Sequence, residues 1–377
     1  MDILIHLLLL ATTLYAGVAL LFFLGLFRLK AQPQTTDKPF LSIVIAARNE
    51  ADYIGNCLDC LKQQTYPSEF FEILVVDDDS TDNTAQIVSA APIDNLRLLS
   101  VGDSFPEMAA KKRPMSVGIQ QARGEWILTT DADCTVPPHW IAQMAAYMTT
   151  DTGVVIGFSQ LKTATEKLTA FERLQAFDFL TLLSAAAGAT GLGFPLAASG
   201  QNLAYRKELF DRVNGFSRIA HRPSGDDVLL LQLLRRAWAG RFAFATCPKT
   251  FVSTWRSETP ASFAQQRRRW ASNAAYQLKL NPIFFLYIAI IFLTNALIPL
   301  SFGMAIFNNN YLLPIACFVT KTFADLLVTW RGAHIFGRTD LLHQLPLWEL
   351  FQVPYTVLIG LTGTLRGFTW KGRHHQS

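Results

Sequence analysis

Three long apolar stretches near the two ends of the chain have the length of membrane helices. Residues 3–27 and 282–307 carry no formal charge, and about 20 helical residues span a hydrocarbon core. Residues 311–330 are similar but contain Lys321 and Asp325. These two side chains are four positions apart, so a helix allows them to pair inside a bundle. We therefore predict an N-terminal anchor and a C-terminal pair of membrane helices.

Between these stretches, short apolar runs alternate with segments of helical periodicity. The runs are rich in β-branched residues and predict buried strands at residues 40–47, 70–76, 96–101 and 125–128. Helical patterns occupy residues 52–64, begin again near residue 83, and return at 116–122. This alternation predicts an α/β domain with a mostly parallel sheet and helices on both faces. In such sheets, ligands bind beyond the carboxyl ends of the strands.

The pattern changes in the second half of the chain. Residues 168–187 predict a helix that either lies on the membrane surface, covers an active site, or is an ordinary amphipathic helix. Residues 199–206 predict a turn that leads into a strand, followed by a helix from Lys207. The run 228–238 predicts another helix. After residue 281 the chain turns apolar.

Charges beside the apolar stretches indicate the topology. Asp2 precedes the first stretch, whereas Arg28 and Lys30 follow it. A cleaved signal carries its positive charges first, so we interpret the stretch as a retained anchor with the following residues in the cytoplasm. Prolines and charged residues interrupt the last apolar stretch, residues 345–368. This favours a re-entrant or interfacial segment there.

Composition narrows the class of protein. Half of the 377 residues are apolar and 16% are charged, which suits a membrane protein with a water-soluble part. The net charge of +4 is mild, and without a long basic run we expect no nucleic acid partner. Five cysteines without a framework spacing argue against a disulfide scaffold. Cys57 and Cys60 form a C-x-x-C pair, but no second pair completes a zinc site.

Aspartates follow two of the predicted strands. Asp77, Asp78 and Asp79 follow the second strand, and Asp131 and Asp133 follow the fourth. In an extended segment, positions i and i+2 face the same way. Two carboxylates on one side favour a divalent cation that also holds phosphate oxygens. A surface turn is the alternative for each cluster alone, but two clusters at one sheet edge favour a shared pocket.

Two further polar groups are candidates for chemistry. Asp226 and Asp227 stand at the start of a predicted helix, where an aspartate also serves as a cap. Residues 265–270 contain three consecutive arginines. These either bind phosphate or mark the cytoplasmic side of the membrane. Neither a G-x-G-x-x-G after the first strand nor a P-loop motif is present, which disfavours dehydrogenases and P-loop nucleotidases.

The order of the polar motifs resembles one enzyme family. The motifs are Val75-Val76-Asp77-Asp78-Asp79-Ser80-Thr81-Asp82, Asp131-Ala132-Asp133, Gly225-Asp226-Asp227 and Gln266-Arg267-Arg268-Arg269-Trp270. With them, residues 40–270 resemble glycosyltransferase family 2, in its membrane-bound branch with a Q-x-x-R-W motif. That branch includes polysaccharide synthases and enzymes similar to ceramide glucosyltransferase. The resemblance implies a GT-A type domain with a Rossmann-like sheet, flanked by transmembrane helices.

The resemblance also implies roles for individual residues. Asp78 is expected to hold the nucleobase. The rest of the expected nucleotide-sugar pocket is Ala46, Arg48, Glu50, Lys111 and Asp131. Asp133, together with Asp131, is expected to bind Mg2+ or Mn2+, and Asp227 is the expected catalytic base. The residues expected to border the acceptor and the diphosphate are Asp226, Gln266, Arg269 and Trp270. Pro114-Met115-Ser116 and Gly225-Asp226-Asp227 depart from the commoner family patterns, which leaves the sugar and acceptor undefined.

These observations predict an inverting, metal-dependent transfer of a sugar from a nucleotide sugar, with UDP as the expected nucleotide. The expected acceptor is a lipid or a membrane-associated glycan. The alternative is a processive synthase that extrudes a polymer through its membrane helices. The expected domains are an anchor at 1–30, a cytoplasmic catalytic domain at 40–280 and a membrane region at 281–377, located by default in a bacterial inner membrane. A transporter and a catalytically inactive scaffold are the rival classes.

Overall fold

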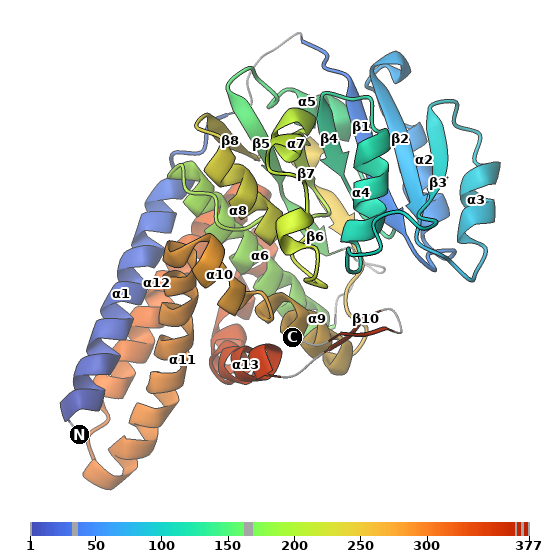
Figure 1. The fold of residues 1–377 in the computed structure, drawn as a ribbon. Coiled ribbons are helices and arrows are strands. Elements are labelled where there is room, and N and C mark those ends of the chain that lie inside the picture. The colour runs from blue at the N-terminus through green and yellow to red at the C-terminus, as the bar shows by residue number, and fades with distance from the viewer. Residues whose placement is uncertain (1, 32–36, 162–168, 366–367, 371–372, 376–377) are drawn as a thin grey trace. The chain divides into compact units, whose positions relative to one another are not determined.

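The computed structural model describes residues 2–31, 37–161, 169–365, 368–370 and 373–375 (Figure 1). Contacts within the chain divide it into two units. The α/β unit comprises Leu29–Ala164 and Gly193–Arg256, and the helical unit comprises Met1–Arg28, Thr165–Leu192 and Ser257–Ser377. Residues 165–192 and 257–280, which the sequence analysis includes in the catalytic domain, thus group with the helical unit.

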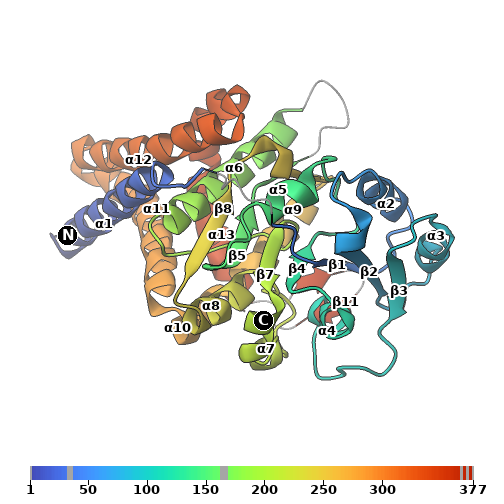
Figure 2. The same ribbon diagram turned by 90° about the horizontal axis from the view of Figure 1, so that it is seen from above.

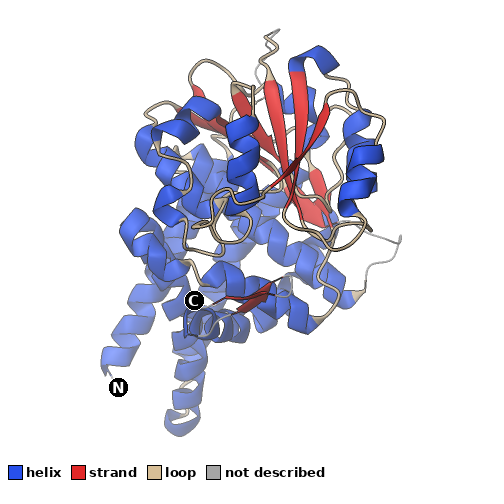
Figure 3. Ribbon diagram, turned by 45° about the vertical axis from the view of Figure 1, so that its right-hand side comes forward, coloured by secondary structure: helices blue, strands red, loops and turns tan. Residues whose placement is uncertain are grey.

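The α/β unit is built on a seven-stranded sheet with the order β3-β2-β1-β4-β7-β5-β8 (Figure 3). Its strands are β1 (Leu41–Ala47), β2 (Phe71–Asp77), β3 (Leu96–Ser100), β4 (Trp126–Thr129), β5 (Thr152–Gly157), β7 (Leu203–Arg206) and β8 (Arg241–Ala245). Neighbouring strands are parallel, except that β7 is antiparallel to β4 and β5. Two short strands, β6 (Ser159–Leu161) and β9 (Val252–Thr254), pair with each other. The mostly parallel sheet confirms the predicted fold class.

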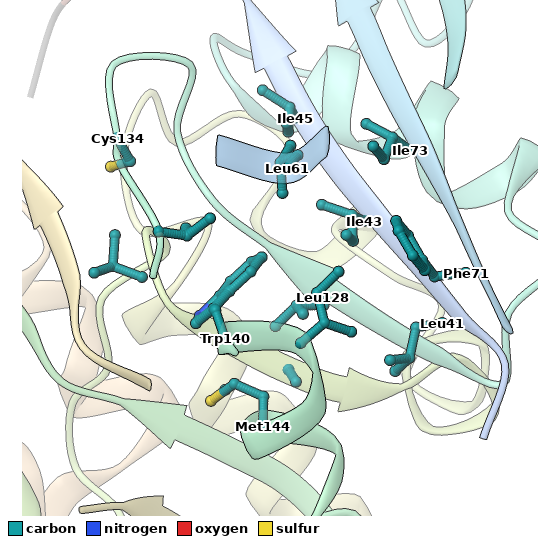
Figure 4. Close-up of a cluster of buried hydrophobic side chains, with 14 of the residues drawn as sticks. Leu41, Ile43, Ile45, Leu61, Phe71, Ile73, Leu128, Cys134, Trp140 and Met144 are labelled. Carbon is teal, nitrogen blue, oxygen red and sulfur yellow. The ribbon is translucent and has the colours of Figure 1, made fainter. Parts of the chain in front are cut away.

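Helices cover both faces of this sheet (Figure 2). They are α2 (Ile54–Lys62), α3 (Thr84–Ala90), α4 (Lys112–Gln121), α5 (Trp140–Ala145), α7 (Lys207–Arg212) and α8 (Val228–Ala237). Because strand side chains alternate between faces, Val75 packs with α2 and α5, whereas Val76 packs with Val117 of α4. Figure 4 shows the first of these cores, in which Leu61 and Trp140 cover Ile43 and Ile45 of β1.

A buried glutamate ties three strands together. Glu72 of β2 is fully buried and accepts hydrogen bonds from the Ser42 hydroxyl (2.7 Å) and the Arg123 N–H (2.7 Å). Burial by itself raises the pKa of this carboxyl, but the hydrogen bonds from Arg123 and Ser42 outweigh it and lower the pKa. The Gly124 N–H in turn donates to the Ser42 hydroxyl (2.8 Å). An ionised Glu72 therefore holds the starts of β1, β2 and β4 in register.

Among the described residues of the helical unit, three helices have the length and hydropathy to cross a membrane. They are α1 (Asp2–Leu26), with its apolar span at Ile3–Leu26, α11 (Pro282–Asn308) and α12 (Leu312–Phe336). They coincide with the three predicted membrane helices. The other elements are α6 (Ala170–Gly191), α9 (Pro260–Ala271), α10 (Ala274–Leu280), α13 (Leu345–Leu365) and the strands β10 (Phe368–Trp370) and β11 (Arg373–His375). The third C-terminal segment, α13, is not among the three candidate spans, and its re-entrant or interfacial placement stays a prediction.

Helix α6 packs against α1 and α12 inside this unit. A Cβ atom added to Gly25 of α1 would lie only 2.0 Å from the carbonyl oxygen of Gly188 in α6. The two backbones therefore approach each other at a distance that only glycine permits, as small residues allow between membrane helices. Of the placements considered for residues 168–187, a helix lying on the membrane surface does not describe α6, because most of its length is buried among its neighbours.

A buried ionic cluster joins α1, α12 and α13. The Lys321 ammonium lies 2.9 Å from Asp325 and 2.6 Å from Glu349, and it donates to the side-chain oxygen of Gln352 (2.6 Å). The Tyr15 hydroxyl donates to Asp325 (2.5 Å). The predicted pairing of Lys321 with Asp325 is thus confirmed, and it extends to two further helices.

Candidate active site

The carboxyl ends of β1, β2 and β4 meet at one edge of the sheet, as parallel pairing requires. Strand β7 brings a second polypeptide segment to the same edge. Because β7 runs antiparallel to β4, its first residue, Leu203, pairs with Thr129, the last residue of β4. The Thr129 hydroxyl also donates to the Gly200 carbonyl (2.8 Å). The turn before β7 therefore lies beside the aspartates that follow β4.

The loops after β1 and β2 are fastened to each other. The Arg48 guanidinium donates to the Asp78 carbonyl oxygen (2.5 Å) and lies 3.6 Å from the Asp78 carboxylate. The Thr81 N–H donates to the Asn49 side chain (2.8 Å), and the Glu50 N–H donates to the Thr84 hydroxyl (2.8 Å). Asp78 is 3% exposed. With Ala46 near the end of β1, the structure brings together four of the residues expected at the nucleotide: Ala46, Arg48, Glu50 and Asp78.

Asp131 and Asp133 offer a set of oxygen ligands for a divalent cation. Ligand atoms from Asp131, Asp133 and Cys134 lie within 4.8 Å of one another. Burial, reinforced by the Asp133 carboxylate, raises the pKa of the Cys134 thiol well above its ordinary value, and a thiol suits softer metals than a hard divalent cation. The two carboxylates remain, which fits a hard cation that takes its other ligands from phosphate and water.

Cys57 of the C-x-x-C pair lies beneath this site. Its thiol is fully buried and lies 3.7 Å from the Asp131 carbonyl oxygen. Burial raises the pKa of Cys57 far above its ordinary value. The thiol is therefore protonated and unreactive, and it packs in the core rather than serving redox or metal chemistry.

Lys111 connects the aspartates of two motifs. It stands immediately before α4 and donates a hydrogen bond to the Asp131 carboxylate. Its ammonium also lies 3.5 Å from Asp226. Burial by itself lowers the pKa of Lys111, but the carboxylates of Asp131 and Asp226 outweigh it and raise the pKa. Lys111 is thus a permanent cation between the D-x-D segment (Asp131-Ala132-Asp133) and the start of α8. The sequence alone did not predict that Lys111 connects these two segments.

Asp227 is the N-cap of α8, and both of its carboxylate oxygens are held. One accepts a hydrogen bond from the Val228 N–H (2.6 Å) and the other from the Gly200 N–H (3.1 Å). Desolvation, reinforced by the Asp226 carboxylate, raises the pKa of Asp227 above that of an ordinary aspartate. The residue is only partly buried, so a small molecule can reach it. Capping and catalysis are therefore compatible in this one side chain.

Gly200 was not among the predicted site residues. A Cβ atom at this position would lie 3.4 Å from a carboxylate oxygen of Asp226, 3.5 Å from the Cβ of Asp227 and 3.5 Å from the Lys111 ammonium. A side chain at this position would therefore lie in contact with all three of these groups. Its sequence context, a Ser-Gly-Gln-Asn turn ahead of a strand, identifies the turn but not its neighbours.

Gln266, Arg269 and Trp270 lie on α9, in the helical unit. The side chain of Gln266 accepts a hydrogen bond from Arg267 (2.9 Å). Arg267 is buried, pairs with Asp178 through two of its nitrogens (3.0 and 2.5 Å), and lies over the Trp270 ring at 4.1 Å. Within the basic run, Arg267 thus has a structural function inside the unit, rather than either of the two roles considered for it.

Comparison with known proteins adds independent information. Residues 42–213 match the model of the family described as glycosyl transferase family 2. The glycosyltransferase AglE of Haloferax volcanii is 30% identical over 197 residues, which cover 52% of this chain and 60% of AglE. A probable glycosyltransferase of Sulfolobus acidocaldarius is 23% identical over 344 residues, or 88% of this chain and 70% of that protein. The match to AglE thus spans less than two thirds of its length.

The fold also has a counterpart among solved structures. The mannosyltransferase PcManGT from Pyrobaculum calidifontis, in complex with GDP-Man and Mn2+, superposes with a TM-score of 0.63. The match covers 96% of this chain and 98% of that chain at 17% sequence identity. This confirms the predicted GT-A type fold. The family match covers residues 42–213 of this chain, and the structural match shows the fold alone.

Proposed function

We propose that this chain is a membrane-bound, inverting glycosyltransferase that moves a sugar from a nucleotide sugar to a lipid or membrane-associated glycan. The observation that carries the proposal is the group of charged side chains at the sheet edge, where Lys111 and Asp131 of the region that matches family 2 meet Asp226 and Asp227. The similar mannosyltransferase PcManGT is seen in complex with GDP-Man and Mn2+. We expect UDP as the nucleotide here.

The two fastened loops suit the nucleotide end of the donor. Arg48 fixes the position of Asp78 by binding both its backbone and its carboxylate, so the carboxylate is available in one orientation as an acceptor for nucleobase N–H groups. Asp131, whose side chain is 30% exposed, suits the ribose or sugar hydroxyls. Asp133, with Asp131, would hold Mg2+ or Mn2+. Such an ion, when bound, neutralises charge on the diphosphate leaving group.

Asp227 is the proposed general base. An inverting displacement needs one carboxylate that takes the proton from the acceptor hydroxyl as its oxygen attacks the anomeric carbon, while the nucleoside diphosphate leaves. The raised pKa of Asp227 brings its basicity closer to neutral pH, which favours this role. The N–H groups of Gly200 and Val228 fix the carboxylate in place, and the Lys111 ammonium lies 3.5 Å from the neighbouring Asp226 carboxylate.

The membrane helices favour an acceptor that resides in the membrane. Three helices have the length to span it, and the charges around the first of them favour a cytoplasmic active site. Gln266, Arg269 and Trp270 are proposed to border the acceptor and the diphosphate.

The decisive experiment is a transfer assay on the purified protein in detergent. A panel of UDP- and GDP-sugars is incubated with membrane lipid extract, with and without Mg2+ or Mn2+. Asp227→Asn is compared with Asp211→Asn, a control in the same unit whose carboxylate is exposed and pairs with Lys207. Metal-dependent labelling of one lipid, lost in Asp227→Asn but not in Asp211→Asn, supports the proposal. A ladder of polymer lengths would favour the processive synthase, and absence of both turnover and nucleotide binding would refute the enzyme.

A further inference from the structure

Lys112 is buried, and it has no role in the reaction proposed above. It is 1% exposed and begins α4, directly after Lys111. A buried ammonium is costly unless its N–H groups are hydrogen-bonded. The Lys112 ammonium donates to the carbonyl oxygens of Arg222 (2.5 Å) and Ser224 (2.9 Å). Its position is therefore determined by a segment 110 residues away in the chain.

The segment that Lys112 binds leads directly to the proposed base. Ser224 is followed by Gly225, whose φ of +88° is a left-handed conformation, and then by Asp226 and Asp227. The Gly225 carbonyl accepts the hydrogen bond of the Leu229 N–H (3.1 Å), which belongs to the first turn of α8. A displacement of the Ser224 carbonyl would thus pass through one residue into both aspartates.

A second bond joins the same two segments. The Ala109 N–H donates to the Ala220 carbonyl (2.8 Å). Together with the contact between Lys111 and Asp226, residues 109–112 hold residues 220–226 at both ends and in the middle. Adjacent lysines divide the task, because Lys111 binds side-chain carboxylates and Lys112 binds backbone carbonyls.

We propose that Lys112 is a positioning residue that sets the location of Asp226 and Asp227 relative to the D-x-D segment. This inference rests on the proposed function for its catalytic consequence, but its structural consequence is independent of it. A lysine fits the position because its slender stem crosses the core and its terminal ammonium carries three donors. Methionine has a similar shape and offers no donor.

Removing the donors should release the loop without touching the nucleotide pocket. In Lys112→Met, we expect kcat to fall by about a hundredfold, the typical effect of a shift of one ångström, while KM for the donor changes little. Water would reach Asp227 more easily, which should lower the pKa of its carboxyl group. The acid-side decline of kcat in the pH profile should therefore move to lower pH. A merely structural role would reduce the active fraction, measured by nucleotide-binding stoichiometry, without moving the pH profile.

A readout without turnover separates this inference from the proposed function. Amide hydrogen exchange in Lys112→Met should accelerate at Val228, Leu229 and Leu231, whose N–H groups bond to Gly225 and Asp227, but not in β1 and β2. Lys207→Met, which removes a partly buried lysine of the same unit that pairs with Asp211, is the control. If amide exchange accelerates at these positions in Lys112→Met while the wild-type protein transfers no sugar, the positioning role is supported and the proposed enzymatic function is rejected.

Two outcomes would overturn the inference. One is unchanged exchange at the start of α8 together with wild-type kcat and pH profile in Lys112→Met. If Lys112→Met does not fold, Lys112→Gln provides a shorter side chain with fewer donors and no charge. It should fold, with a reduced kcat and a partial shift of the acid-side decline of kcat. Wild-type kinetics in Lys112→Gln, with exchange unaltered at Val228 to Leu231, is the second outcome that would overturn the inference.

Discussion

Gly200 offers the sharpest test of the site, because stability and activity should respond to it in opposite directions. The backbone of Gly200 is outside the left-handed region, so alanine can adopt it. The added methyl group would meet its nearest neighbours at 3.4 to 3.5 Å, which is ordinary van der Waals contact. Replacing glycine by alanine in a compatible conformation stabilises a protein by about 0.4–1 kcal/mol, because the unfolded chain has less freedom to lose.

The same methyl group would occupy the space between Lys111, Asp226 and Asp227. An acceptor hydroxyl must come within hydrogen-bonding reach of the Asp227 carboxylate. We expect Gly200→Ala to lower kcat/KM for transfer by about tenfold to a hundredfold, which corresponds to about 1.4–2.7 kcal/mol in the activation barrier. Nucleotide affinity should stay close to that of the wild type, because the fastened loops lie elsewhere along the edge.

The assay combines thermal unfolding in detergent with initial rates of transfer at varied acceptor concentration. Gly55→Ala is the matched control, since Gly55 lies in α2 and a Cβ there would meet only Ile87 at 3.8 Å. It should also be slightly more stable and fully active. Wild-type activity in Gly200→Ala would refute the view that this glycine faces the reacting groups. Loss of stability together with activity would instead mean that the turn is under strain.

Four further outcomes are expected. Because only the ionised carboxylate of Asp227 acts as a base and its pKa is raised, kcat should decline as the pH falls through a value above the ordinary aspartate range, which a pH–rate profile measures. Asp133→Ala should remove the effect of Mg2+ or Mn2+ on donor affinity, measured by calorimetry with and without the ion. Because the pKa of Glu72 is lowered, its ionised form stabilises the fold above the pKa of the unfolded chain. Glu72→Gln should therefore cost about 1.5–3 kcal/mol in urea unfolding at neutral pH and progressively less as the pH falls through the folded pKa. Lys321→Met should lower stability in detergent by about 3–5 kcal/mol, and the added change Glu349→Gln should recover part of the loss in the same melting assay.

The strands and their acidic ends could be predicted because their signals are local. Runs of β-branched residues mark β1, β2 and β4, and parallel strands must end at one edge. The positions of Asp78 and Asp131 at this edge could therefore be predicted from the sequence. The capping position of Asp227 is also a local signal, and the functional roles of all three residues stay predictions.

The contacts that connect the residues of the site could not be predicted, because they join residues that are far apart in the sequence. The sequence around Gly200 does not indicate that β7 pairs antiparallel with β4. Helix α4 was predicted to begin at Ser116, but it begins at Lys112, because Pro114 lies in the first turn, where its missing N–H is tolerated. That early start gives Lys111 and Lys112 their places. Lysine is usually a surface residue, so pattern alone would not assign either one to the interior.

The close crossing of Gly25 and Gly188 has a consequence for the order in which the chain is made. Helix α1 is translated before its partners within the helical unit, which are α6, α11 and α12. At roughly 5–20 residues per second, α1 waits about ten seconds or longer for α6 and longer still for the last two. During that interval its glycine surface faces lipid. A competing small-residue helix in the same membrane can occupy that surface before the partners of α1 are made.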